Sequence, residues 1–468
     1  MTAFAKTAFT KPGSPRHIAV IDIGKTNVKL ALVDRAAMVE LAVLTRPNRV
    51  LPGPPYPHFD TEGHWRFLLE GLAQFQASHG VDAISITTHG ACAALLDADG
   101  ALATPVLDYE HDGPGETAAE YDALRPAFSE TGSPRLGMGL NLGAQLHWLF
   151  ARDAGLADRV RQVVTWPQYW GYRLTGVLAC DLSSLGCHTD LWEPGAGRFS
   201  RLVDRMGLGG KMAPPLRPDA ILGPLLPAIA MNTGLAPLTP VVCGIHDSNA
   251  SLLPHLLTQA GPFSVVSTGT WVVCMAIQGT TPALDEARDT LINVAADGRP
   301  VPSARFMGGR EYALVRAGRA AVATEADEAR VLAAGLMLFP SIIPKGGPFP
   351  GQVTRWSAAP GDYSNACQEV ALSFYLALMT AECLAMIGAG GAVIVEGPFA
   401  ANQAYCRMLA AATARTVLRA ASQTGTSIGA ALLFGAPDSA VPMVATVTTA
   451  NAVDYGTYAR AWRATISG

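Results

Sequence analysis

Two apolar hairpins of the same design, one near the start of the chain and one past its middle, constrain the fold most strongly. The first, AVIDIGKTNVKLAL, begins at Ala19, and the second, SVVSTGTWVVCMAI, begins at Ser264. When the two are aligned, Asp22 falls on Ser267, and both hairpins place a glycine in a polar turn. A repeat at the start of each half predicts two α/β halves.

The length and composition agree with two domains. A chain of 468 residues is too long for one hydrophobic core, and with 49% apolar and only 15% charged residues it can bury large ones. We expect a loose tail over 1–15, an N-terminal domain over 16–240 and a C-terminal domain over 241–468. The boundary follows 193–240, a stretch rich in Gly and Pro that is typical of surface loops.

Charge and cysteine usage exclude several classes of protein. The formal net charge of −4, without a basic block or an acidic tail, indicates neither a nucleic-acid partner nor a membrane surface. The eight cysteines show no CxxC and no zinc spacing, so we expect small buried side chains in a reduced, cytoplasmic protein. The most apolar run, 370–388, is interrupted by Glu382, which favours a buried core helix over a membrane span.

The polar turns of the hairpins carry the residue types that hold a phosphate chain and its metal. A glycine lets backbone N–H groups point at a phosphate, and hydroxyls add donors. A carboxylate instead holds Mg²⁺, usually through water, so we interpret Asp22 as the metal carboxylate. The residues predicted on the phosphate side are Gly24, Lys25, Thr26 and Asn27 in the first turn, and Thr268, Gly269 and Thr270 in the second. The alternative is that these are ordinary turn residues.

Four segments in order resemble the FGGY carbohydrate kinases of the actin/hexokinase/Hsp70-like ATPase superfamily. They are DIGKTN, GIHDSNAS, STGTW and the late run EGPFAANQ…TGTSIGAA, and the resemblance covers roughly residues 16–436. It implies an α/β fold of two ribonuclease-H-like (actin-like ATPase) domains with a deep interdomain cleft. It also implies an enzyme that uses ATP and Mg²⁺ to phosphorylate a sugar hydroxyl.

The resemblance assigns roles by motif position. Asp247 would be the general base and, together with Asp22, would lie at the metal. Gly397 and Asn402 would lie near the adenosine. The alternative for Asp247 is a helix N-cap, a role compatible with catalysis, and Asn402 has the same alternative.

The resemblance also implies sugar contacts, although the family's Trp-x-Asp sugar segment is replaced here by PVLDYEHDGPGE. The residues expected on the sugar side are His89, Gly90, Asp108, Tyr109, Gln168 and His246. The alternative for His89 is a satisfied histidine at a strand end, and we expect Trp166 and Trp170 to be core residues. The pair His246-Asp247 is most similar to the rhamnulokinase and fuculokinase branch, which points to a ketose such as L-rhamnulose or L-fuculose.

Two residues depart from the family pattern. Lys25 replaces a small or hydroxyl residue and would either add charge at the β- and γ-phosphates or obstruct them. Glu396 replaces the first glycine of a pair, and it would either meet the ribose hydroxyls or alter the nucleotide preference.

Two rival functions share this fold. An actin- or chaperone-like ATPase would need an added peptide-binding domain or a polymer surface, and only about thirty residues follow the last motif. A non-catalytic sugar sensor would need a basic helix-turn-helix, which the short N-terminal tail lacks. A homodimer is compatible with the sequence, although no segment indicates an interface.

Overall fold

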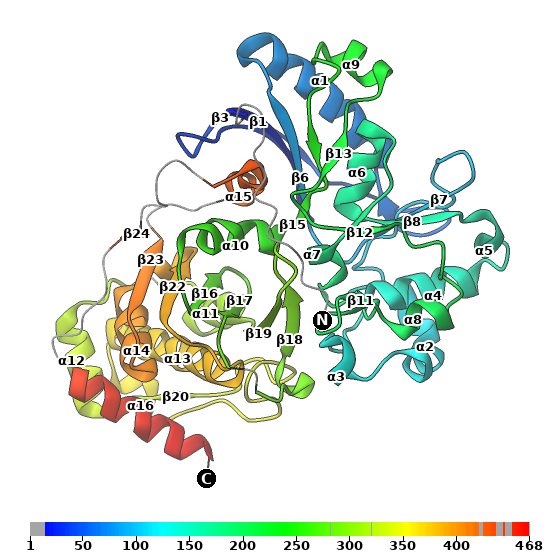
Figure 1. Cartoon of the computed structure of the whole chain (residues 1–468). Helices are drawn as coiled ribbons and strands as arrows, with labels where there is room; N and C mark the ends of the chain where they lie inside the picture. Colours follow the sequence, from blue (N-terminus) through cyan, green and yellow to red (C-terminus); the bar gives the residue numbers. More distant parts are fainter. Residues whose placement is uncertain are drawn as a thin grey trace.

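Two seven-stranded sheets form the framework of the protein (Figure 1). The computed structural model describes residues 15–280, 282–319, 321–420, 425–436, 443–444 and 452–467, so most of the expected tail lies outside the described residues. The N-terminal sheet contains β13 (Ile221–Gly223), β14 (Val241–Val242), β6 (Ala83–Thr88), β1 (His17–Ile23), β2 (Asn27–Asp34) and β3 (Val39–Pro47), in that order, with β15 (Ile245–His246) also paired to β6. The C-terminal sheet runs β18 (Thr290–Val294), β19 (Pro300–Phe306), β17 (Val272–Ile277), β16 (Phe263–Thr268), β22 (Ala392–Glu396), β23 (Val417–Ala420) and β24 (Met443–Val444).

The predicted internal repeat is confirmed by the strand pairing. Strand β1 is antiparallel to β2 and parallel to β6, and β16 is likewise antiparallel to β17 and parallel to β22. In both turns the glycine amide closes the loop at 2.9 Å, from Gly24 to the carbonyl of Asn27 and from Gly269 to that of Trp271. The central strands are buried on both faces, which explains their nearly continuous apolar runs.

A set of helices packs on one face of each sheet. On the N-terminal sheet, α1 (Thr61–His79) contacts β1, β2 and β3, while α6 (Trp166–Thr175) packs on β6 and α9 (Pro227–Thr233) on α1. The C-terminal core packs against α11 (Gly308–Arg316), α12 (Glu325–Ala334), α13 (Asn365–Met386), α14 (Gln403–Thr413) and α16 (Ala452–Ser467).

Helix α10 (Asp247–Thr258) is shared by the two sheets. Its Ala250 and Leu253 belong to the apolar cluster that contains Ile18 of β1, whereas Leu252 packs with Val265 of β16. Figure 1 shows the helix between the two halves. Because α10 packs against both sheets, its first residue, Asp247, is fixed relative to both.

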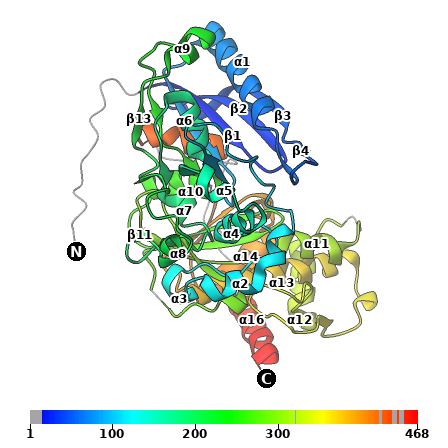
Figure 2. The same ribbon diagram turned by 90° about the vertical axis from the view of Figure 1, so that its right-hand side faces the viewer.

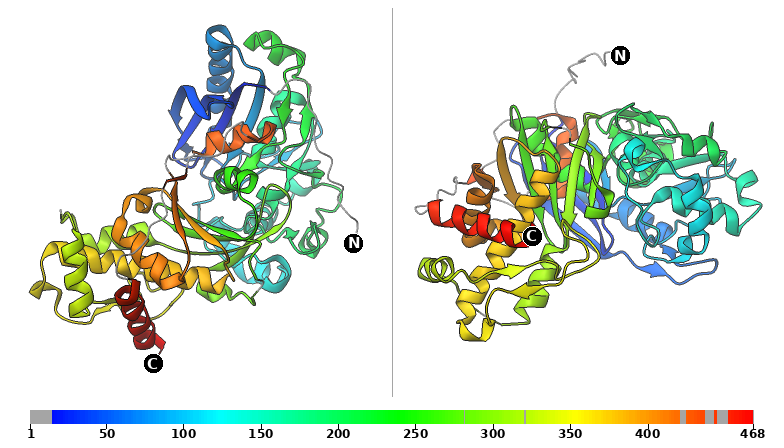
Figure 3. Two further views of the ribbon diagram at one scale, coloured as in Figure 1. Left: turned by 60° about the vertical axis from the view of Figure 1, so that its left-hand side comes forward. Right: turned by 90° about the horizontal axis from the view of Figure 1, so that it is seen from below.

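The structure divides the chain differently from the expected boundary after residue 240. Strands β14 and β15 belong to the N-terminal sheet, and α15 (Thr426–Ala431) returns from the C-terminal half to pack on β1 and β6. The Ser85 hydroxyl donates to the carbonyl of Ala430 at 2.7 Å. In the left view of Figure 3, the orange α15 lies beside the blue N-terminal strands.

A smaller, mostly helical region extends the N-terminal half (Figure 2). It contains β7 (Ala93–Leu96), β8 (Gln162–Thr165), α2 (Ala118–Leu124), α3 (Phe128–Thr131), α4 (Leu142–Arg152), α5 (Leu156–Arg159), α7 (Leu182–Leu185) and α8 (Arg201–Arg205). Its buried residues form a core of their own around Trp148.

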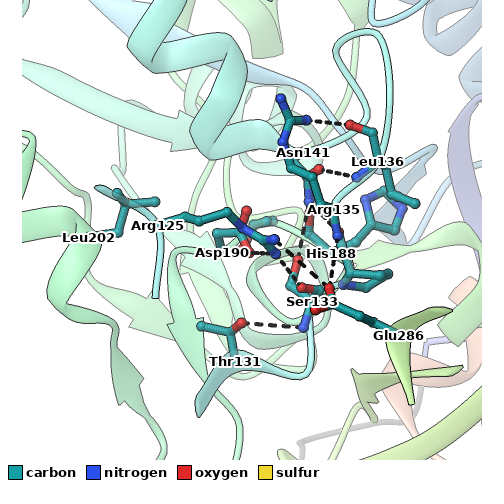
Figure 4. A network of polar contacts seen from close by, with 12 residues as sticks. Arg125, Thr131, Ser133, Arg135, Leu136, Asn141, His188, Asp190, Leu202 and Glu286 are labelled. Atoms are coloured by element: carbon teal, nitrogen blue, oxygen red, sulfur yellow. Dashed lines mark hydrogen bonds and ion pairs between the residues drawn. The ribbon is translucent and has the colours of Figure 1, made fainter. Parts of the chain in front are cut away.

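This region also touches the C-terminal half. The amide of Ile292 donates to the carbonyl of Gly132 at 2.8 Å. Next to it, a polar network around Arg125 and Asp190 includes Glu286 of the C-terminal half, which accepts a hydrogen bond from the amide of Arg135 at 3.4 Å (Figure 4). The two halves thus also meet here, in addition to the contacts made by α10 and α15.

The structure confirms that the apolar run 370–388 lies in a core helix and that the cysteines are buried. All eight cysteines are buried and free. Among the described helices, α13 alone is long and apolar enough to cross a membrane, and 78% of its most apolar stretch is buried inside the protein. It is the central helix of the C-terminal core, and β22 follows it as predicted.

Candidate active site

The carboxyl ends of three parallel strands bring the first group of candidate residues together. Asp22 lies near the end of β1, where it is paired with Thr87 of β6, and His246 of β15 is paired with Thr88 of the same strand. The amide of His89 donates to the carbonyl of Ile23 at 2.9 Å, which places the residue after β6 beside the first turn. Residues separated by more than 200 positions in the sequence therefore meet at one sheet edge.

Asp22 is held from the other half of the chain. Its Oδ2 accepts hydrogen bonds from the hydroxyls of Thr426 and, at 3.4 Å, Ser427, both in α15. Burial raises the pKa of the Asp22 carboxyl, and the nearby charge of Asp247 raises it further. The two carboxylates thus lie close enough to repel each other, an arrangement that a cation between them would relieve.

Asp247 is the first residue of α10, and the N-cap position belongs to His246. Its Oδ1 accepts the amide of Ser248 at 2.6 Å and lies 3.1 Å from Nε2 of His246. Burial raises the pKa of Asp247, while the hydrogen bond from the amide of Ser248 lowers it. A carboxylate of raised basicity at a helix N-terminus suits a general base.

The histidines beside Asp247 are neutral. Burial lowers the pKa of His246 to about 4, and its Nε2 lies 3.5 Å from the thiol of Cys187. A Cβ added to Gly90 would lie 3.0 Å from this Nε2, so Gly90 lets the end of β6 approach the ring closely.

His89 carries an unpaired polar atom. Its Nδ1 bonds to the carbonyl of Gly90 at 2.7 Å, and burial lowers its pKa to about 4. Its Nε2 is buried and has no hydrogen-bond partner within the described residues. The ring packs against Tyr109 and Phe59 with centroid separations of 5.1 and 5.4 Å. This is not the satisfied histidine of the alternative interpretation, because a buried acceptor without a partner is costly unless a ligand or water supplies a donor.

Lys25 points to the side of the site that carries His89, because its ammonium and the His89 ring both pack on Tyr109. Its ammonium forms ion pairs with Asp108 and, at 3.1 Å, with Glu110. It also lies over the ring of Tyr109, 4.9 Å from the centroid. Thr26 and Asn27, the remaining side chains of the turn, are exposed.

The first turn is braced by two residues that sequence reasoning missed. Asn48 donates its side-chain amide to the carbonyl of Gly24 at 2.8 Å and its backbone amide to that of Thr26 at 2.9 Å. His64 of α1 lies 2.7 Å from Oδ1 of Asn48. Nothing local in the sequence indicates these contacts.

Gln168 has a structural role in the segment before Asp247, and its expected place on the sugar side stays a prediction. It is fully buried, accepts the hydroxyl of Thr165 and donates to the carbonyl of Cys243 at 2.8 Å. It therefore positions the segment between β14 and β15 that leads to Asp247. Trp166 and Trp170, on the same helix, are core residues as expected.

The second turn borders a pocket of about 630 Å³ in the C-terminal half. The pocket is lined by Gly269, Thr270, Gly309, Arg310, Tyr312, Ala313, Pro398, Phe399, Ala401 and Asn402. A Cβ on Gly309 would lie only 2.0 Å from the carbonyl oxygen of Gly269, so this close approach requires glycine. The residues contributed by α11 were not predicted, although the doublet Gly308-Gly309 before Arg310 is a visible signal.

Thr268 and Gly397 adjoin this pocket, since each is the sequence neighbour of a lining residue, Gly269 and Pro398 respectively. The Thr268 hydroxyl donates to the carbonyl of Glu396 and accepts the amide of Phe399 at 3.1 Å, so it organises the backbone. Gly397 has a φ of 79°, and a Cβ there would lie 2.0 Å from the carbonyl oxygen of Thr268. Asn402 caps α14 by accepting the amide of Tyr405 at 3.1 Å and also lines the pocket.

Glu396 has a partner that the sequence did not indicate, and its expected role toward the nucleotide stays a prediction. Its carboxylate is buried and bonds to Nε2 of His255 in α10 at 2.7 Å. It therefore joins the strand beside the pocket to the helix that begins with Asp247.

The carboxylates fit a magnesium ion that is shared with a substrate. Within the described ranges, no group of three or more His, Cys, Asp or Glu side chains could hold a metal alone. Asp22 and Asp247 offer two carboxylates, and Mg²⁺ is commonly held by one or two carboxylates together with waters and substrate phosphates.

Comparisons with known proteins agree on the family. Residues 17–254 match the N-terminal domain of the FGGY family of carbohydrate kinases, and residues 260–442 match the C-terminal domain of carbohydrate kinase FGGY. The crystal structure of a carbohydrate kinase from Novosphingobium aromaticivorans superimposes with a TM-score of 0.87 at 36% identity, covering 96% of this chain and 100% of that one.

Named relatives are more distant. An L-fuculokinase of Salmonella typhi is 25% identical over 273 residues, which are 56% of this chain and 57% of the relative. A rhamnulokinase of Pectobacterium carotovorum subsp. carotovorum is 26% identical over 285 residues, 57% of this chain and 54% of the relative. The matches thus span little more than half the length of these relatives.

Proposed function

Because the chain belongs to the FGGY family of carbohydrate kinases, we propose that it transfers the γ-phosphoryl group of ATP to a hydroxyl of a ketose such as L-rhamnulose or L-fuculose. The observation that carries the proposal is the meeting of Asp22 and Asp247 at the sheet edge that also holds His89 and His246. The ketose assignment rests on the His246-Asp247 pair and on the distant relatives named above.

Asp247 acts as the general base in this proposal. Its carboxylate accepts the proton of the sugar hydroxyl as that oxygen attacks the γ-phosphorus, and the bond from phosphorus to the bridging oxygen of ADP breaks. Burial favours proton acceptance by raising the pKa of Asp247. Phosphoryl transfer otherwise depends on alignment and charge neutralisation, so few protein groups are needed.

The other residues bind and orient. Mg²⁺, held by Asp22 and Asp247, would neutralise charge on the phosphates. Gly269, Thr270 and Asn402 bind the nucleotide in the 630 Å³ pocket, and Gly397 supports it as the neighbour of the lining residue Pro398. His89 and Asp108 bind the sugar.

A coupled ADP-release assay with Mg·ATP tests the proposal. The acceptors are L-rhamnulose, L-fuculose, L-ribulose, D-xylulose and glycerol, with Asp247→Ala beside the wild type. We expect sugar-dependent ADP release that the substitution abolishes. If no acceptor causes ADP release, the sugar sensor would be favoured. If ATP hydrolysis depends neither on sugar nor on Asp247, the chaperone-like ATPase would be favoured.

The cytoplasmic location and the homodimer stay predictions. Light scattering of the purified protein would test the oligomeric state.

A further inference from the structure

The side chain of Lys25 leaves the phosphate turn and joins the wall that carries His89. Lys25 sits in the β1–β2 turn, yet its ammonium is paired with Asp108 and Glu110, more than eighty residues away in the sequence. The rings of Tyr109 and Phe59 flank it, with centroids 4.9 and 5.4 Å from Nζ. The ammonium is thus fixed in direction by two carboxylates and two rings.

The local charge disfavours a phosphate ligand at this position. One ammonium against two carboxylates leaves a net charge of −1 around Lys25. The carboxylate of Asp247 lies near Tyr109 as well and adds to the negative potential. A polyanionic triphosphate approaching Lys25 would therefore meet more negative than positive charge.

The same cluster suits a neutral hydroxylated ligand. The Lys25 side chain is 22% exposed and that of Glu110 is 55% exposed, so both can meet a solute. An ammonium donates and a carboxylate accepts, and a hydroxyl group can satisfy both at once. The ring of His89 packs against Tyr109, and its buried Nε2 offers a further acceptor that lacks a protein partner among the described residues.

We propose that Lys25 and Glu110 bind hydroxyl groups of the acceptor sugar and so select which neutral polyhydroxylated sugars are phosphorylated. Lys25 is in this reading a specificity residue of the sugar site. The inference rests on the proposed kinase function, which it deepens.

Steady-state kinetics of Lys25→Met and Glu110→Gln provide the first test. A hydrogen bond from a charged group to a sugar hydroxyl is worth about tenfold or more in affinity, so we expect KM for the best sugar of the panel to rise by about that factor. KM for ATP should stay within about twofold, because no contact to phosphate is lost. Lys211→Met is the matched control, since Lys211 is a partly exposed lysine of the N-terminal half whose ammonium donates to the carbonyl of Ala157, outside the proposed site.

Single-deoxy analogues of that sugar separate direct contact from a structural effect. The wild type should discriminate against the analogue that lacks the hydroxyl bound by Lys25, and Lys25→Met should lose that discrimination at that position alone. Uniform loss against all analogues, or a rise of KM for ATP with that for sugar unchanged, would overturn the proposal.

Calorimetric titration with the same panel sugars, without ATP, distinguishes failure of this inference from failure of the kinase function. Sugar binding by the wild type that weakens in Lys25→Met supports the role of Lys25 even if no phosphorylation occurs. Equal binding by both proteins overturns it, and no binding of any panel sugar by the wild type overturns both proposals.

Discussion

Replacing Gly429 by alanine should displace the helix that carries the proposed base, and the size of the displacement follows from one contact. Gly429 lies in α15, and a Cβ on it would lie 1.8 Å from the carbonyl oxygen of Ala250 in α10. Real Cβ atoms essentially never approach within 3.0 Å, so the helices must separate by at least about 1.2 Å. Asp247 begins one helix and Thr426 of the other donates to Asp22, so both proposed carboxylates move.

A misplacement of about 1 Å at a reacting group costs on the order of a hundredfold in rate, and we expect kcat of Gly429→Ala in the ADP-release assay to fall by that amount. Overpacking of this kind also costs about 1–3 kcal/mol, which thermal unfolding would register as a lower midpoint.

Gly425→Ala is the matched control. Gly425 is the N-cap residue of the same helix, with a φ of −63°, and a Cβ there would meet no atom of the described residues within 4 Å. It should keep the wild-type kcat and midpoint. A Gly429→Ala protein with wild-type kcat would refute the reasoning that contact between α10 and α15 positions the carboxylates.

Four further predictions address the base, its protonation, the buried histidines and the nucleotide pocket. Asp247→Asn, which removes the base at constant shape, should lower kcat by about 10²- to 10⁴-fold; a loss below tenfold in the ADP-release assay would contradict the assigned role. Since burial raises the pKa of Asp247 and the base must be ionised, kcat/KM of the wild type should begin to fall, as the pH is lowered, at a higher pH than an ordinary exposed aspartate would give. His64, His89 and His246 have folded pKa values of about 4 against an ordinary 6.5, so the unfolded chain binds more protons than the folded protein between these two pH values. The free energy of unfolding, measured in urea, should therefore be highest above pH 6.5 and decrease progressively toward pH 4. A free energy that does not change with pH would contradict the burial of these histidines in their neutral form. Gly397→Ala, strained at a φ of 79° and only 2.0 Å from the carbonyl oxygen of Thr268, should raise KM for ATP about tenfold with KM for the sugar unchanged; equal rises of both would instead indicate a general distortion.

Local pattern was sufficient to predict the framework. The two hairpins were recognisable because a strand, a polar glycine turn and a second strand are adjacent in sequence, and their pairing with β6 and β22 follows the same rule in both halves. The positions of Asp22 and Asp247 at strand and helix ends were likewise visible, although their roles stay proposals.

The direction of long side chains could not be predicted from the same pattern. Lys25 meets Asp108, and Glu396 meets His255 across 141 residues of sequence, so neither partner could be inferred from neighbours along the chain. The partner of Gln168, a backbone carbonyl of a distant segment, could not be inferred for the same reason. The return of α15 to the first sheet depends on the apolar surface of β1 and β6, which no motif records.

The path of α15 has a consequence for any attempt to divide the protein. A cut between α10 and β16 would leave the first fragment with the apolar side chains of Ile18, Val20 and Val33 stripped of the cover that Leu432–Phe434 and their neighbours provide. The second fragment would lose the sheet on which that cover rests. Expressed separately, the two pieces should therefore be insoluble alone and recover when produced together, so the protein is better treated as one cooperative unit than as two exchangeable modules.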